Sequence, residues 1–187
     1  MYLRAGFAIE TRSADETAGL GVCAGLASPP GTLFCLRGDL GAGKTVFVGG
    51  MARGVLPPGA AQVTSPTYVL LHVHRGGGKA LYHLDVYRLP KGGGEFEASG
   101  LCECLADPAG VVCIEWAERV EEALPADRVE VEIEHQAPGA RLIHILATGP
   151  SSGKVVDELV RLAGNRARLR KAMDDLSREA GQVIADS

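Results

Sequence analysis

The chain has 187 residues, 46% of them apolar, and a formal net charge of −4 at pH 7. A chain of this length can bury one sizeable core, and its acidic balance argues against a general nucleic-acid surface, which needs clustered Lys and Arg. No run of about 18 apolar residues occurs and the N-terminus lacks a signal-peptide pattern, so we expect a cytoplasmic protein without a membrane segment. The five cysteines are odd in number, which favours reduced thiols.

Hydrophobic periodicity and turn residues divide most of the chain into helices and strands. Ser13 and Glu16 have the spacing of a capping box before apolar residues at helical spacing. In chain order we predict a helix over 15–27, a strand over 32–37, a helix from the Gly-rich loop to about Gly54, a hairpin of 69–74 and 80–87 with a loose turn, a strand over 110–114, a short helix over 117–123 and a second hairpin of 128–135 and 141–147. Strands interleaved with helices predict a three-layer α/β/α domain with a mixed sheet.

The most specific pattern is GDLGAGKT at residues 38–45, a full match to G-x-x-x-x-G-K-[ST] between an apolar strand and a helix. In this setting the N–H groups from Gly41 to Val46 converge on an anion at a helix N-terminus. Lys44 would reach the β- and γ-phosphates, and the Thr45 hydroxyl would bind Mg²⁺. The motif therefore predicts a P-loop that binds a nucleoside triphosphate.

A P-loop ATPase also needs a carboxylate at the end of a neighbouring buried strand. Glu115 follows four apolar residues and is the first candidate, although a surface glutamate at a helix start is the alternative. Asp85 ends the run 81–84 and is the rival metal-binding or water-positioning acid. Its alternative role is a structural carboxylate that pairs with Arg88 or a backbone turn.

Three further groups of residues are candidates for function. Thr64, Ser65 and Thr67 form either a switch segment near the γ-phosphate or an ordinary polar turn. Trp116, the only tryptophan, packs in the core or contacts the nucleotide or a partner. A zinc site is disfavoured because Cys-x-Cys is not a usual zinc spacing; its candidate ligands are His72, His74, His83, Cys102 and Cys104.

The composition changes after residue 149. Pro150 to Gly153 predict a linker, and residues 154–187 have apolar residues at helical spacing, which predicts an amphipathic helical tail. The predicted division is therefore a P-loop domain over 1–149 and a linker with a helical tail over 150–187. The tail packs on its own domain or a neighbour, or else binds a dedicated partner.

Several motifs in the same order and spacing resemble the bacterial TsaE family. These are GDLGAGKT, VTSPTYVL, LYHLDVYRL, the Glu-rich stretch before Gly100-Leu101, and VCIEWAER. The resemblance covers roughly residues 10–147. TsaE is the ATPase component of the machinery that makes threonylcarbamoyladenosine in tRNA.

The resemblance implies a Mg²⁺-dependent ATPase with ATP and Mg²⁺ as its ligands. It places the ATP phosphates on Leu40, Gly41, Ala42, Gly43, Lys44, Thr45 and Val46. It places Mg²⁺ on Thr45 and Glu115, gives Asp85 a catalytic or switch role beside Lys44, and puts Trp116 on the rim of the site. It also implies TsaD and TsaB as partner proteins, with tRNA contacted only through that complex.

The chain departs from the family at Val46, where a second Thr is common, and at Gly92 to Gly94, which replace a more polar stretch. Adenine contacts are assigned only to the segments around Ala14 to Thr17 and near Gly139. Arg88 is a possible internal arginine finger, although a salt bridge is the alternative. Two other functions are open: a P-loop small-molecule kinase, and a nucleotide-gated interaction module that does not hydrolyse ATP.

Overall fold

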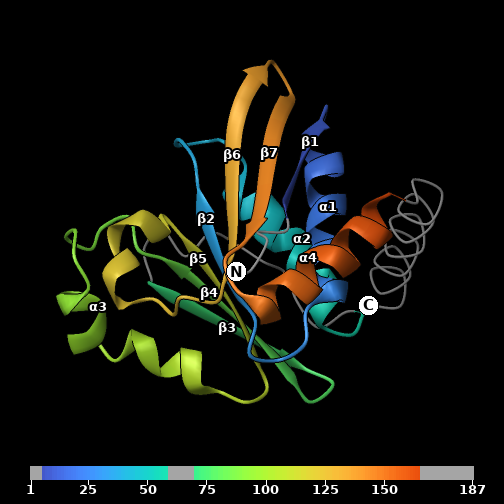
Figure 1. Ribbon diagram of the computed structural model, residues 1–187. Coiled ribbons are helices and arrows are strands. Elements are labelled where there is room, and N and C mark those ends of the chain that lie inside the picture. The colour runs from blue at the N-terminus through green and yellow to red at the C-terminus, as the bar shows by residue number, and fades with distance from the viewer. Residues whose placement is uncertain (1–5, 59–69, 165–187) are drawn as a thin grey trace, which may run out of the picture.

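The computed structural model describes residues 6–58 and 70–164, and its centre is one mixed sheet of seven strands (Figure 1). The strands lie in the order β1-β7-β6-β2-β5-β4-β3. Their bounds are β1 Gly6–Thr11, β2 Leu33–Arg37, β3 Leu71–Gly76, β4 Lys79–Asp85, β5 Gly110–Glu115, β6 Val129–Ala137 and β7 Ala140–Ala147. β2 is parallel to β5 and β6, and β4 is parallel to β5, whereas the outer pairs are antiparallel.

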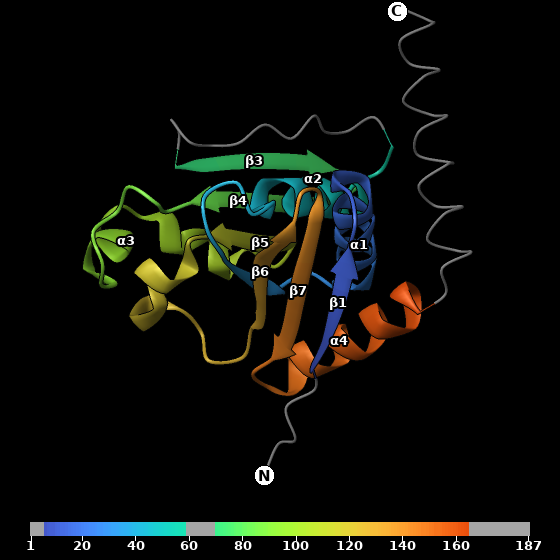
Figure 2. The same ribbon diagram turned by 90° about the horizontal axis from the view of Figure 1, so that it is seen from above.

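Helices lie on both faces of this sheet (Figure 2). One face packs against α1 (Ala14–Ala27), α2 (Lys44–Val55) and α4 (Pro150–Ala163). The opposite face of β2, β4 and β5 packs against shorter elements: α3 (Gly94–Ala98) and the 3-10 helices η1 (Leu101–Ala106), η2 (Ala117–Arg119) and η3 (Glu121–Ala123). The α/β fold with a mixed sheet, predicted from the sequence, is confirmed.

Successive side chains of the central strand β2 point alternately into two hydrophobic cores, one on each face of the sheet. Phe34 and Leu36 of β2 are fully buried on the side of α1, α2 and α4, whereas Leu33 and Cys35 point to the other side. Successive side chains of a strand face opposite sides of the sheet, so a continuous apolar run suits a strand covered on both faces. The predicted strand over 32–37 is confirmed, but it begins one residue later, at Leu33.

Glycines bring α1 and α2 into close contact. A Cβ added to Gly21 of α1 would lie 2.1 Å from the carbonyl oxygen of Phe47, and one added to Gly50 of α2 would lie 2.0 Å from that of Ala18. Gly25 and Gly54, one turn further along each helix, show the same crowding. The two helices therefore pack backbone against backbone, which holds the helix after the Gly-rich loop firmly on α1.

Several local predictions are confirmed. The first helix occupies Ala14–Ala27, with the Ser13 side chain accepting a hydrogen bond from the Glu16 backbone N–H at 3.1 Å. The second hairpin turns at the predicted place, between Ala137 and Ala140.

Other local predictions are wrong or incomplete. The first hairpin has a tight turn at Gly77 and Gly78, both with positive φ, as a two-residue hairpin turn requires. The predicted helix over 117–123 is two 3-10 turns separated by Val120. β1, α3 and η1 were not predicted at all.

Pro150 to Gly153 were predicted to be a linker, and this is also wrong, because they form the first turn of α4. Asp127, in the loop before β6, accepts hydrogen bonds from the backbone N–H groups of Ser151 at 2.8 Å and Ser152 at 2.9 Å. A carboxylate from a distant part of the chain thus satisfies helix N–H groups that a local cap usually serves. Since α4 also buries Val156, it belongs to the same core as the sheet. The predicted tail beyond residue 164 lies outside the described residues.

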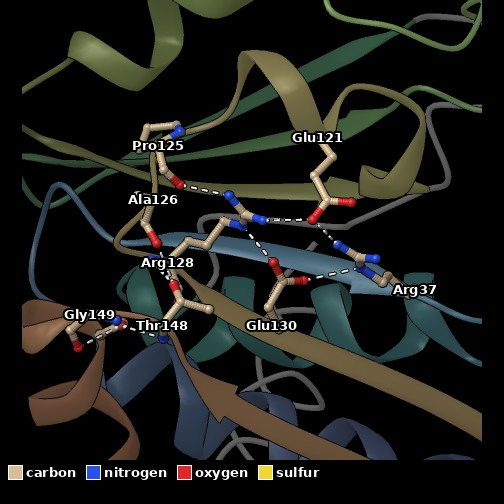
Figure 3. Close-up of polar contacts among 9 residues, drawn as sticks. Arg37, Glu121, Pro125, Ala126, Arg128, Glu130, Thr148 and Gly149 are labelled. Carbon is tan, nitrogen blue, oxygen red and sulfur yellow. Dashed lines mark hydrogen bonds and ion pairs between the residues drawn. The ribbon is translucent and has the colours of Figure 1, made fainter. Parts of the chain in front are cut away.

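An ion-pair network joins the loop after β5 to the central strands (Figure 3). Glu130 of β6 accepts from Arg37 of β2 on one oxygen and from Arg128 on the other. Both arginines also contact Glu121, and Arg128 donates to the carbonyl of Pro125 at 2.9 Å. Each guanidinium is shared between two carboxylates, so the network fixes the loop that leads from η3 into β6.

All five cysteines are free thiols. Burial raises the pKa of Cys23 and Cys104 to about 11, so both stay protonated near neutral pH. Within the described residues, no helix is long and apolar enough to cross a membrane.

Candidate functional site

The Gly-rich loop connects β2 to α2 at the end of the sheet where β5 and β4 also terminate. Gly43 is the N-cap of α2 and has φ 113°, and Gly38 has φ 135°. A Cβ on Gly38 would lie 2.3 Å from the carbonyl oxygen of Ile133, so both torsion and space require glycine there. The first turn of α2 directs backbone N–H groups toward the loop, which suits an anion.

Lys44 is buried at the start of α2 and folds back over the loop. Its Nζ donates to the carbonyl oxygens of Gly38 at 2.6 Å and Asp39 at 2.9 Å. The same ammonium lies 3.8 Å from the centroid of the Trp116 ring, a cation–π contact. Burial lowers the pKa of Lys44 below its usual value, although carboxylates around it, Glu115 first among them, oppose the shift.

Thr45 and Glu115 meet directly. The Thr45 hydroxyl donates to Glu115, with Oγ1 lying 2.8 Å from Oε1 and 3.1 Å from Oε2. Glu115 is the last residue of β5 and only 3% exposed, which places it at a strand's carboxyl end as predicted. A hydroxyl and a carboxylate side by side provide the oxygen ligands that Mg²⁺ prefers. These two residues therefore fit the magnesium ligands assigned to them.

Asp85 lies beside Glu115 on the neighbouring strand. The two residues are partners in the parallel register of β4 and β5, and Asp85 is 7% exposed. Its Oδ1 accepts from the backbone N–H of Tyr87 at 3.0 Å, so one oxygen belongs to the turn after β4. The structural role considered for Asp85 is therefore present, together with a position next to the Thr45–Glu115 pair.

Trp116 is the one described non-glycine residue with positive φ, at 63°. Its backbone N–H donates to Leu36 of β2 at 3.0 Å, and its ring contacts Tyr87 with a centroid separation of 4.8 Å. Left-handed backbone in a bulky residue is costly and persists where the surroundings impose it. This backbone conformation places the indole ring against the ammonium of Lys44, so Trp116 lies beside the Gly-rich loop.

His83 contacts the same carboxylate from within the sheet. Its Nε2 is 2.8 Å from Oε1 of Glu115, and its side chain is fully buried. From the sequence, His83 was a candidate only as a zinc ligand. Among the described residues, no three His, Cys, Asp or Glu side chains gather as a metal site. The sequence could have indicated that His83 lies near this site, because His83 and Asp85 are two residues apart and therefore lie on the same face of their strand.

Arg141 of β7 was not considered from the sequence, yet it contacts the Gly-rich loop. Its Nε donates to the carbonyl oxygen of Ala42 at 3.1 Å, and its Nη1 donates to that of Gly139 at 2.7 Å. The Arg141–Ala42 contact joins residues 99 positions apart, which no local pattern encodes. The guanidinium places positive charge beside a loop that is suited to an anion.

The two segments assigned to adenine contacts also border the loop. A Cβ on Gly43 would lie 3.8 Å from the Thr17 methyl group and 3.5 Å from Nε of Arg141, which in turn holds the Gly139 turn. Of the loop residues, Leu40 is 83% exposed and Val46 is 37% exposed. Arg88 is exposed just beyond β4. The proposed switch residues Thr64, Ser65 and Thr67 lie outside the described residues.

The fold and this site define an α/β protein with a Gly-rich loop at the carboxyl edge of a mixed sheet. Residues 11–143 match the family model described as "Threonylcarbamoyl adenosine biosynthesis protein TsaE". The chain belongs to the TsaE family. The resemblance inferred from the motifs is thereby confirmed.

Relatives and a solved structure agree with this assignment. A protein of Bacillus subtilis named "tRNA threonylcarbamoyladenosine biosynthesis protein TsaE" is 36% identical over 152 residues, which cover 81% of this chain and 92% of the relative. A protein of the same name from Treponema pallidum is 41% identical over 135 residues, covering 72% and 96%. The crystal structure of Bacillus subtilis YdiB has a TM-score of 0.70 at 28% identity and covers 86% of this chain and 98% of that one.

Proposed function

We propose that this protein is a Mg²⁺-dependent ATPase of tRNA threonylcarbamoyladenosine biosynthesis, whose ATP cycle acts on a complex of TsaD and TsaB. The observation that carries the proposal is the contact of Thr45 with Glu115, whose carboxylate also interacts with the ammonium of Lys44. Membership of the TsaE family and the names of its relatives support the pathway.

The charges around the Gly-rich loop support a divalent cation. Four carboxylates act on Lys44, the buried Glu115 and Asp85 among them, so an incoming triphosphate would meet more negative than positive charge even with Arg141 beside the loop. Such an arrangement repels an anion unless another cation is bound. Bound Mg²⁺ would supply charge neutralisation at the β- and γ-phosphates. Thr45 and Glu115 would hold it.

The remaining roles belong to the chain's own groups. The loop N–H groups from Gly41 to Val46 bind the phosphates, and Lys44 leaves the carbonyls of Gly38 and Asp39 to contact them. Asp85 orients the attacking water through its carboxylate. Positioning and charge stabilisation of this kind carry most of the catalysis in phosphoryl transfer.

The protein is proposed to act on partners rather than to bind tRNA itself. Its net charge is −4, and β6 exposes Glu132 and Glu134, which would repel a phosphate backbone. Transfer of the threonylcarbamoyl group then takes place on the TsaD–TsaB complex. We therefore expect slow ATP hydrolysis by the isolated chain.

Phosphate release measured for the chain alone, with TsaB and TsaD together, and with small-molecule acceptors tests this function. Strong stimulation by the protein pair supports the proposal. ADP formation that depends on an acceptor indicates a kinase, and no release in any mixture indicates a nucleotide-gated interaction module.

Removing either metal ligand tests the chemistry. Thr45→Ala and Glu115→Gln each delete one oxygen ligand, and we expect each to lower the stimulated rate of phosphate release by about 10²-fold or more, as loss of one transition-state contact does. Val46→Ala, which leaves the backbone N–H in place, is the matched control and is expected to keep near wild-type rates. Normal turnover in both ligand variants would show the metal assignment to be wrong.

A further inference from the structure

The chain places a buried imidazole against the carboxylate that is proposed to bind Mg²⁺. His83 lies on β4 and Glu115 on the adjacent parallel strand β5. The side chains are 0% and 4% exposed, and Nε2 of His83 lies 2.8 Å from Oε1 of Glu115. Burial shields this contact from bulk solvent, so it is stronger than a surface pair of the same geometry.

The direction of this hydrogen bond follows from the partner. An ionised carboxylate only accepts, so Nε2 carries the proton and donates to Glu115. Nδ1 of His83 is buried and has no hydrogen-bond partner among the described residues. Within that part of the chain, the contact with Glu115 is thus the one polar contact found for the ring. If the imidazole only filled the core, its unpaired nitrogen would destabilise the fold. An apolar side chain of similar size would fill the same space without that cost.

The carboxylate of Glu115 is held from two sides. His83 approaches from the sheet, and the Thr45 hydroxyl approaches from the first turn of α2. Two directional donors restrict rotation of a carboxylate far more than one does. When Thr45 turns its oxygen to a metal ion, His83 is the donor that still fixes the orientation of Glu115.

We infer that His83 is a positioning residue, which orients the Glu115 carboxylate for binding the divalent cation. This inference rests on the proposed function, because it concerns the same metal site. His83 contacts neither nucleotide nor metal and acts through Glu115. Groups that orient metal-binding side chains in this way typically change metal affinity by about 10–100-fold when removed.

Three substitutions of His83 separate orientation from packing. Glutamine places an amide N–H near the position of Nε2, asparagine places its amide near Nδ1, and leucine keeps bulk without a donor. We expect His83→Gln to bind Mn²⁺ almost as the wild type does, and His83→Asn and His83→Leu to bind it about 10–100-fold more weakly. Affinity is measured on the full chain in the presence of ADP, from the electron paramagnetic resonance signal of free Mn²⁺.

Two controls accompany this series. His74→Gln makes the same substitution at a half-buried imidazole on the neighbouring strand β3, whose Nε2 is also buried without a partner among the described residues, and it is expected to leave Mn²⁺ affinity unchanged. ADP binding in the presence of EDTA, measured by calorimetry, reports the loop without metal. It should be equal in the wild type and all of these variants. If His83→Leu does not fold, the contrast between glutamine and asparagine decides the test.

The outcomes distinguish this inference from the function on which it rests. Folded His83→Leu and His83→Asn proteins with wild-type Mn²⁺ affinity would overturn the positioning role alone. Equal losses of metal-dependent and metal-free ADP binding would assign His83 a structural role and also overturn it. A wild-type protein that binds no Mn²⁺ with ADP, or no ADP at all, would overturn the proposed function as well.

Discussion

At the residue scale, the site consists of a few side chains whose polar atoms are already hydrogen-bonded within the protein. Lys44 donates to two loop carbonyls and lies on Trp116, and Thr45 donates to Glu115. A triphosphate and a metal ion would have to replace these contacts. The residues are thus held in place before binding, and binding exchanges partners instead of ordering free side chains.

Trp116 provides a reporter of that exchange, because it is the only tryptophan and its ring lies 3.8 Å from Nζ of Lys44. We expect Mg²⁺·ATP to change its fluorescence emission as the ammonium moves from the indole to the phosphates. Fluorescence titration measures the change. Lys44→Gln is the control, since it removes the charge over the ring and should abolish the response. Nucleotide binding seen by calorimetry without any change in emission would contradict the prediction.

At the scale of elements, the orientation of α2 is set by its contact with α1. Gly21 and Gly25 face Gly50 and Gly54 so closely that any Cβ there would meet backbone atoms at 2.0 to 2.4 Å. Since α2 carries Lys44 and Thr45 on its first turn, this contact also positions the site. The four glycines were visible in the sequence, but their spacing does not reveal which helix they face.

Two neighbouring glycines of α2 are expected to respond oppositely to alanine. Gly50→Ala forces a methyl group against the Ala18 carbonyl and should destabilise the fold by about 1–3 kcal/mol. A methyl group on Gly49 would meet nothing within 4 Å, so Gly49→Ala should stabilise the fold by about 0.4–1 kcal/mol through lower unfolded-state entropy. Chemical denaturation measures both. A Gly50→Ala protein as stable as Gly49→Ala would show that the two helices separate at low cost.

At the scale of the whole molecule, distant segments complete one another. Asp127 serves the N-terminus of α4, and Gly149 leaves room for it, since a Cβ there would lie 2.3 Å from Cγ of Asp127. Burial raises the pKa of Asp127, but hydrogen bonds from Ser152 and Ser151 outweigh it and the pKa lies below its usual value. The carboxylate thereby links α4 to the rest of the core.

This link predicts a pH-dependent contribution to stability. A lowered folded-state pKa means that the contribution is present above the unfolded pKa of about 3.9 and is lost as pH falls through the folded value. We expect Asp127→Asn to be less stable than the wild type by about 0.5–1 kcal/mol at pH 7, a value that allows for solvent screening, with the difference shrinking below about pH 4. Urea denaturation at neutral pH and at about pH 3 measures it. A difference that is constant with pH would exclude the charge of Asp127 as its source.

Much of the fold and part of the site followed from local patterns. The Gly-rich motif with its strand and helix, the capped helix α1 and the end of β5 at Glu115 all depend on residues close in sequence. One prediction failed because a contact with a distant segment decided the structure. Pro150 to Gly153 look like a linker until Asp127 caps them.

By itself, therefore, the sequence determined the α/β class, the place of the Gly-rich loop between a strand and a helix, and the family. The tertiary structure alone decided how the side chains around that loop contact one another, and it added His83 and Arg141 to them. Pairing of β4 with β5 brings Asp85 and His83 to Glu115, and the register of β7 brings Arg141 to Ala42. The physical reason is that periodicity and capping are local properties, whereas strand pairing is chosen by burial summed over the whole core.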